Sequence, residues 1–130
     1  MAETKILTAR PEIKIGEVYY IDFPDRGYGV QAGLRPGIIV SNDTGNLYSP
    51  LVNVIPLTTS RHKFAKNLPM HVKIPGNGIL RDSIALVEQM CPVPKSSIQS
   101  QRLWVADEET IRRIGLAMHL QYPFCSIKSS

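Results

Sequence analysis

The clearest pattern in this chain is a pair of apolar runs, at residues 37–40 and 51–57, separated by a polar segment. Both runs are rich in Ile and Val and are bounded by Gly, Pro, Asn or Asp, which is typical of buried strands. The segment 42–46 combines Asx-turn residues with a glycine and therefore predicts a turn. Each run carries a polar group at one end, Arg35 before the first and Thr58 after the second.

The same criteria predict further strands at 17–23, 70–74, 83–90 and 102–105. Pro92 and Pro94 are expected to break the strand that begins at residue 83, and 95–99 is expected to form a single helical turn. A loop at 24–33 contains three glycines and is longer than a hairpin needs. Loops of this kind are usually functional or mobile.

A terminal helix is predicted from Asp107, which is a good N-cap, up to Pro123, which stops it. Its apolar face is formed at three- and four-residue spacing by Ile111, Ile114, Ala117 and Met118. Several short strands followed by one helix indicate a mainly β fold with added helices, a small antiparallel barrel capped by a C-terminal helix.

The bulk composition suits one domain with a buried core, at 130 residues and 43% hydrophobic content. We predict a flexible N-terminal arm at 1–13, one barrel domain at 14–122 and a C-terminal tail at 123–130. No apolar run approaches the length of about 18 residues that a membrane span needs, and no secretory signal is visible. The two cysteines lack C-x-x-C spacing, so no disulfide framework is expected, and the expected compartment is the cytoplasm.

Several common enzyme patterns are absent, among them the G-x-S-x-G elbow and the Gly-rich phosphate loop. The three histidines, His62, His71 and His119, do not cluster with carboxylates at ligand spacing, so we expect neither a metal nor another cofactor. Cys91 is expected to be a buried small apolar residue. The net charge of +4 suits a nucleic acid or an acidic protein partner, although many enzymes share it. The remaining chemistry is that of cations and hydroxyls.

If the two central strands pair as antiparallel neighbours, Arg35 lies beside the hydroxyls of Thr58, Thr59 and Ser60. Arg35 is either an ordinary exposed or salt-bridged arginine or a fork that grips a phosphate. The two threonines either satisfy backbone groups at a strand end or hydrogen-bond a phosphoryl oxygen as charge develops on it.

A basic loop follows, with Phe64 among its cations Arg61, His62, Lys63 and Lys66. Such a loop is either simply solvated or a contact for single-stranded nucleic acid, made of cations and a stacking ring. His62 also titrates near neutral pH and is a candidate for proton transfer. Glu88 and Gln89 face opposite ways if their segment is a strand, so only one of them reaches a given cleft. Gln31 either hydrogen-bonds base edges or is solvated.

Five segments together resemble the MazF/PemK family of toxins from type II toxin–antitoxin systems, and they follow the order of that family. They cover most of the chain between Gly16 and Ile114 and read GEVYYIDF, GLRPGIIVSNDTGN, VNVIPLTTS, LPMHVKI and RDSIALVEQM. The resemblance implies an SH3-like barrel of the CcdB/MazF type that forms a homodimer. It also implies a metal-independent, sequence-selective endoribonuclease for single-stranded RNA, chiefly messenger RNA. Attack by a 2′-hydroxyl would leave a 2′,3′-cyclic phosphate and a 5′-hydroxyl.

Carried over by position, the resemblance implies catalytic roles for Arg35, Thr58 and Glu88. The candidates for holding RNA are Gln31, Thr59, Ser60, Arg61, His62, Lys63 and Gln89. The implied partners are RNA, an acidic MazE-like antitoxin and, together with that antitoxin, operator DNA. Two alternatives stay open: a CcdB-like toxin that poisons a protein such as DNA gyrase, and a barrel that binds nucleic acid without catalysis.

Overall fold

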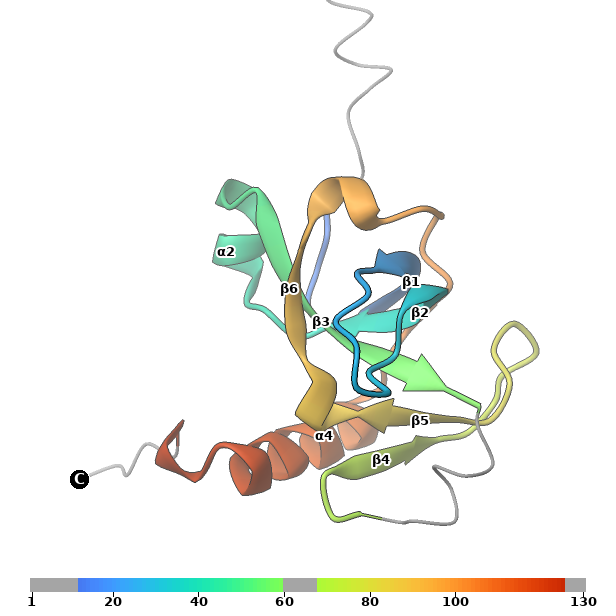
Figure 1. The fold of residues 1–130 in the computed structure, drawn as a ribbon, viewed down its shortest axis with the longest axis vertical. Coiled ribbons are helices and arrows are strands. Elements are labelled where there is room, and N and C mark those ends of the chain that lie inside the picture. Colours follow the sequence, from blue (N-terminus) through green and yellow to red (C-terminus); the bar gives the residue numbers. More distant parts are fainter. Residues whose placement is uncertain (1–11, 60–67, 126–130) are drawn as a thin grey trace, which may run out of the picture.

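The computed structural model describes residues 12–59 and 68–125, which form a curled half-barrel of antiparallel strands with a helix packed beside it (Figure 1). Most of the predicted basic loop at 61–69 and most of the predicted N-terminal arm lie outside these residues. Among the described helices, none has the length and apolar character that crossing a bilayer requires.

The strands run β4-β5-β3-β2-β1-β7 across the described sheet, and β6 pairs with the first half of β3. Every pairing is antiparallel, which confirms the predicted barrel class. The bounds are β1 (Glu17–Phe23), β2 (Gly33–Ile39), β3 (Leu51–Thr58), β4 (His71–Ile74), β5 (Ser83–Leu86), β6 (Cys91–Pro94) and β7 (Trp104–Val105).

Two α-helices and three short 3-10 turns complete the described fold. Helix α4 begins as predicted, because the Asp107 carboxylate accepts a hydrogen bond from the Thr110 N–H at 2.8 Å. The predicted turn at 42–46 is instead a short helix, since Asn42 caps it by accepting from the Gly45 N–H at 2.7 Å. The bounds are α2 (Asp43–Tyr48), η1 (Val87–Gln89), η2 (Lys95–Ser97), α4 (Glu108–Gln121) and η3 (Pro123–Cys125).

The core has two parts, one on each side of the curled sheet. One lies between the sheet and α4, where Ile114 and Ala117 are buried. Ile111, which was predicted on the same face, is 40% exposed. The other part fills the inside of the half-barrel and includes Ile13. Ile13 is only 7% exposed, so it belongs to the packed domain rather than to the arm in which the sequence placed it.

The prediction of one strand at 83–90 is wrong, because η1 interrupts it after Leu86. Leu57 and Val54 of β3 are three residues apart, whereas their partners Ala85 and Cys91 are six apart. The turn η1 therefore inserts three residues between two strands that both pair with β3.

The prediction that prolines end the strand is also wrong, because Pro92 and Pro94 lie inside β6. They occupy the two exposed positions of the strand, while Cys91 and Val93 point into the core. Among the described strands β6 pairs only with β3, so it is an edge strand. Proline is tolerated on an edge because a missing N–H there breaks no ladder.

Candidate active site

The two strand ends that carry Arg35 and Thr58 meet, as the sequence predicted. Strands β2 and β3 pair in antiparallel register, with Ile38 opposite Ile55 and Gly37 opposite Pro56. Continuing this register by two residues brings Arg35 opposite Thr58. Both residues line one hollow of about 170 Å³, together with Leu34, Pro36, Leu57, Thr59 and Ser83.

This hollow opens where the β2–β3 ladder stops, and two prolines mark the place. Pro36 and Pro56 have no N–H to donate, and the paired residues end at Gly37 and Pro56. Gly37 itself permits close packing of β2 on β1. A Cβ at this position would lie 2.8 Å from Cζ of Phe23 and 2.9 Å from Cδ1 of Ile21. The strand that carries Arg35 is therefore held firmly against β1 just beyond the arginine.

The Arg35 guanidinium is fixed by the end of the β1–β2 loop. Its Nε and Nη2 donate to the carbonyl oxygen of Ala32 at 3.0 and 2.7 Å, and its Nη1 donates to Oε1 of Gln31. Arg35 takes part in none of the ion pairs between described residues. Burial lowers the pKa of the guanidinium, but an arginine stays protonated in proteins. Within the described part of the chain, the site thus holds a partly buried cation without a carboxylate partner.

The β1–β2 loop is tied in turn to Gln89. The Gln31 N–H donates to Oε1 of Gln89 at 2.8 Å, and Nη2 of Arg26 donates to the Gln89 carbonyl oxygen at 3.3 Å. Between these two anchors the loop displays Tyr28, which is fully exposed. Its φ of 57° lies in the left-handed region, which non-glycine residues rarely adopt. The loop therefore presents an aromatic ring to solvent from a strained backbone with fixed ends.

Glu88 lies in the same turn as Gln89 but contacts a different residue. Its Oε2 is 3.0 Å from Nε2 of His71, and Glu88 is absent from the lining of the hollow. Glu88 and Gln89 contact different partners, as predicted. They do so because they lie in the turn η1, and not because side chains alternate along a strand.

The hydroxyls at the site differ in exposure. Thr58 is 5% exposed and Thr59 is exposed, while Ser83 is 4% exposed and its Oγ donates to the Arg81 carbonyl oxygen at 2.7 Å. Ser83 is not among the predicted site residues, because only the pairing of β3 with β5 brings it to the hollow. Four predicted contacts, Ser60, Arg61, His62 and Lys63, lie outside the described residues.

The described residues contain no group of three or more His, Cys, Asp or Glu side chains that would hold a metal ion. Cys91 is buried as predicted, and burial raises the pKa of its thiol. A raised thiol pKa keeps the sulfur protonated and therefore unreactive.

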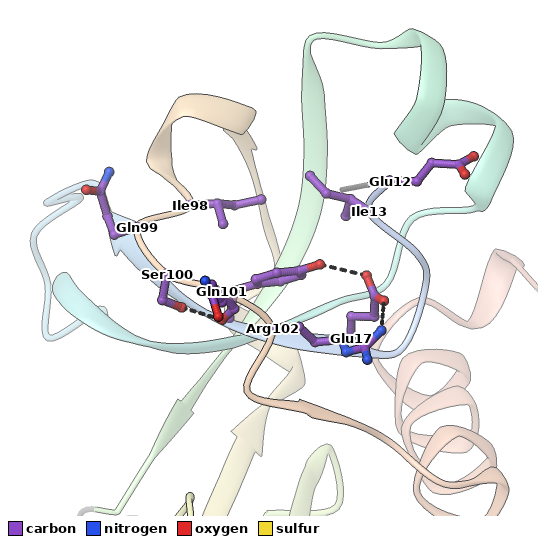
Figure 2. A pocket seen from close by; sticks show the side chains of 9 residues that line it. Glu12, Ile13, Glu17, Ile98, Gln99, Ser100, Gln101 and Arg102 are labelled. Carbon is purple, nitrogen blue, oxygen red and sulfur yellow. Dashed lines mark hydrogen bonds and ion pairs between the residues drawn. The ribbon is translucent and has the colours of Figure 1, made fainter. Parts of the chain in front are cut away.

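A larger hollow of about 690 Å³ lies elsewhere, at the mouth of the half-barrel, and neither Arg35 nor Thr58 lines it (Figure 2). At its side the Glu17 carboxylate accepts hydrogen bonds from the Tyr19 hydroxyl at 2.8 Å, the Lys14 N–H at 2.7 Å and Nη1 of Arg102 at 3.1 Å. These bonds join the segment 14–19 to Arg102, so this network stabilises the fold.

The chain matches a known protein family over most of its length. The family model described as PemK-like, MazF-like toxin of type II toxin-antitoxin system covers residues 14–121. The chain belongs to this toxin family. The resemblance inferred from the five sequence segments is thereby confirmed.

Two relatives of this toxin carry names that describe an activity. The Endoribonuclease EndoA of Bacillus subtilis is 31% identical over 110 residues, which are 83% of this chain and 92% of the relative. The Endoribonuclease MazF of Staphylococcus saprophyticus is 31% identical over 116 residues, which are 88% of this chain and 94% of the relative.

Solved structures of MazF-type toxins share the fold. MazF from Deinococcus radiodurans superposes with a TM-score of 0.72 at 18% identity, over 85% of this chain and 96% of the other. An endoribonuclease from a Mycobacterial species, solved with its cognate antitoxin, gives a TM-score of 0.67 at 23% identity, over 85% and 95% of the two chains. The predicted barrel with a C-terminal helix is therefore confirmed.

Proposed function

We propose that this toxin is a metal-independent, sequence-selective endoribonuclease that cleaves single-stranded RNA, chiefly messenger RNA. The observation that carries the proposal is the hollow at the end of the β2–β3 ladder, which Arg35 and Thr58 both line. Membership of the toxin family and two relatives named endoribonuclease support it. These relatives do not favour a toxin of the gyrase-poisoning type.

RNA carries its own nucleophile, so the protein has mainly to fix geometry and stabilise charge. The ribose 2′-oxygen forms a new bond to the adjacent phosphorus, and the bond from phosphorus to the 5′-oxygen breaks. The products are a 2′,3′-cyclic phosphate and a 5′-hydroxyl. The 2′-hydroxyl proton passes to solvent water, and solvent supplies the proton that the leaving 5′-oxygen takes up.

Arg35 stabilises the negative charge that develops on the phosphorane oxygens. Its bonds to Ala32 and Gln31 use three of the five N–H donors of a guanidinium. The remaining donors and the permanent charge suit a phosphate, and no described carboxylate competes in an ion pair. Its partial burial strengthens this attraction because the local dielectric constant is low.

Thr58 places its hydroxyl on a phosphoryl oxygen from the opposite strand. The side chain is almost completely buried at the base of the hollow, so its position is set by strand pairing rather than by solvent. A hydroxyl fixed in this way costs no reorganisation when charge develops.

The RNA strand is held by the loop and the residues around the hollow. Tyr28 offers an exposed ring on which a base stacks, and stacking of this kind tolerates any base. Gln31, Gln89 and Thr59 supply hydrogen-bonding groups beside Arg35. We assign the backbone contacts to the predicted residues Ser60, Arg61, His62 and Lys63.

The partners that we propose follow from charge and from the relatives. A MazE–MazF complex from Deinococcus radiodurans and a Mycobacterial endoribonuclease with its cognate antitoxin have been solved. We propose an acidic antitoxin whose C-terminal segment occupies the RNA groove, because the toxin has a net charge of +4. We also propose a cytoplasmic homodimer that binds operator DNA together with the antitoxin.

The test is incubation of the purified toxin with a mixed-sequence RNA in EDTA. Discrete products that persist without metal support the proposal. Intact RNA, with a salt-sensitive gel shift, favours a barrel that binds nucleic acid without cleaving it. Intact RNA without a shift favours a toxin that acts on a protein.

A further inference from the structure

His71 is a buried titratable residue whose ring is only partly satisfied. Its side chain is 3% exposed, and its Nε2 lies 3.0 Å from Oε2 of Glu88. Within the described structure, Nδ1 of His71 and Oε1 of Glu88 are both buried without a hydrogen-bond partner. Burying polar atoms in this way costs free energy, so a pair that does it calls for an explanation.

The place of His71 in the sheet suggests the explanation. It is the first residue of β4 and pairs with Leu86, the last residue of β5 before the turn η1. Among the described side chains none caps η1 with a hydrogen bond, and the N–H of Met90 donates to the carbonyl oxygen of Val87 at 3.1 Å. The bond from His71 to Glu88 therefore fixes a turn that has few bonds of its own.

The other side chain of this turn leads to the active site. Gln89 accepts from the Gln31 N–H at 2.8 Å, and Gln31 accepts from Nη1 of Arg35. A continuous series of contacts thus joins His71 to Arg35, through Glu88, the backbone of η1, Gln89 and Gln31. His71 does not line the hollow beside Thr58.

We propose that His71 is a positioning residue for RNA cleavage, which holds η1 through Glu88 and thereby sets the position of Arg35. The inference rests on the proposed function. In this pair we assign the N–H donor to Nε2 of His71 and the acceptor to Oε2 of Glu88. Glu88 is also a positioning residue, because it accepts this hydrogen bond. In this account it does not take the proton of the 2′-hydroxyl.

The experiment compares two replacements of His71 in the full chain. His71→Gln keeps an N–H donor at a similar reach, whereas His71→Leu removes it and leaves the Glu88 carboxylate to turn toward solvent. With a short RNA substrate, we expect His71→Leu to lower kcat by about tenfold or more, because displaced catalytic groups lose rate steeply. KM should change less than kcat, and His71→Gln should restore most of the rate.

Glu88→Gln separates positioning from proton transfer. Its amide oxygen accepts the same hydrogen bond from Nε2 of His71 but cannot act as a base. We expect a kcat within about threefold of the wild type, with an unchanged pH profile. A loss of roughly 100-fold would mean that Glu88 carries the proton, which would overturn the proposal. If His71→Leu does not fold, Glu88→Leu removes the same bond from the partly exposed side.

A readout without RNA keeps the inference distinct from the proposed function. In ¹H–¹⁵N spectra, His71→Leu should shift the Gln31 amide and the Arg35 Nε–H signals, while His71→Gln should not. Unmoved signals in folded His71→Leu would refute the series of contacts, whether or not the protein cuts RNA. If the signals move in His71→Leu but the wild type leaves RNA intact, the contacts are supported and the proposed nuclease activity is refuted.

Discussion

Arg35 and Thr58 lie across from each other, on β2 and β3, at the point where the ladder between these strands has ended. Neither residue depends on a flexible loop for its backbone position. Two prolines and a glycine that packs against Phe23 determine where the strands separate. In the proposed mechanism, a cation and a hydroxyl reach one phosphate from opposite sides.

Thr58→Val tests the contribution of the hydroxyl at nearly constant volume. We expect a fall in kcat on the order of 10²-fold, because a fixed donor to the developing charge is lost. Thr58→Ser keeps the hydroxyl and should retain most of the rate. Single-turnover cleavage of a short RNA measures the difference, with thermal unfolding as the check on the fold. Equal rates for folded Thr58→Val and the wild type would remove Thr58 from the mechanism.

Tyr28→Ala tests base stacking by the exposed loop. Stacking of one base on an aromatic ring contributes about 1–3 kcal/mol, so binding to single-stranded RNA should weaken by roughly tenfold or more. Tyr28→Phe keeps the ring and should bind like the wild type. All these variants also carry Arg35→Ala, so that the RNA is not cleaved. Their affinities are measured by fluorescence anisotropy with a labelled RNA. Unchanged binding by Tyr28→Ala would exclude the stacking role.

Gly37→Ala tests the close contact between β2 and β1. The added Cβ would lie 2.8 Å from Cζ of Phe23, so we expect a loss of about 1–3 kcal/mol in the free energy of unfolding. Gly115→Ala is the matched control, since no described atom beyond its own helix backbone lies within 4 Å of its Cβ position. In the interior of α4 it should stabilise the protein by about 1 kcal/mol. Chemical denaturation measures both changes in the free energy of unfolding, and we expect Gly37→Ala to lower it and Gly115→Ala to raise it.

Alkaline pH tests the network around Glu17. Burial and the hydrogen bond to Glu17 raise the pKa of Tyr19 in the folded state. The unfolded chain therefore loses the tyrosine proton first, at its ordinary pKa of about 10. The stability that the Tyr19 hydroxyl contributes is fully present below that pH and is lost as the pH rises above it. Tyr19→Phe should be less stable than the wild type at neutral pH. Between pH 9 and 11 its free energy of unfolding should fall less, and the difference from the wild type should correspond to the titration of one tyrosine.

The sequence was most informative where local pattern and tertiary structure agree. Strand β1 follows from its apolar composition between Gly16 and Pro24, and the start of α4 follows from the cap at Asp107. The meeting of Arg35 with Thr58 followed from one assumption, that neighbouring apolar runs pair as antiparallel strands.

Other features depend on contacts that have no local signal. The turn η1 lies inside an apolar run that is indistinguishable from a strand, and only its pairing with both halves of β3 fixes it. Local sequence predicts that Pro92 and Pro94 break a strand, because their exposure on an edge strand is a tertiary property. His71 and Glu88 are 17 residues apart, so their hydrogen bond depends on the β4–β5 pairing.

The most direct test of the central claim uses one RNA oligonucleotide with a single cleavage position, prepared with either a ribose or a 2′-deoxyribose at that position. Product masses are measured in EDTA with the wild type and with folded Arg35→Ala. The wild type should convert only the ribose form, to a 2′,3′-cyclic phosphate and a 5′-hydroxyl, and Arg35→Ala should cut at least about 10³-fold more slowly. Cleavage of the 2′-deoxy form, or wild-type rates from Arg35→Ala, would contradict the account.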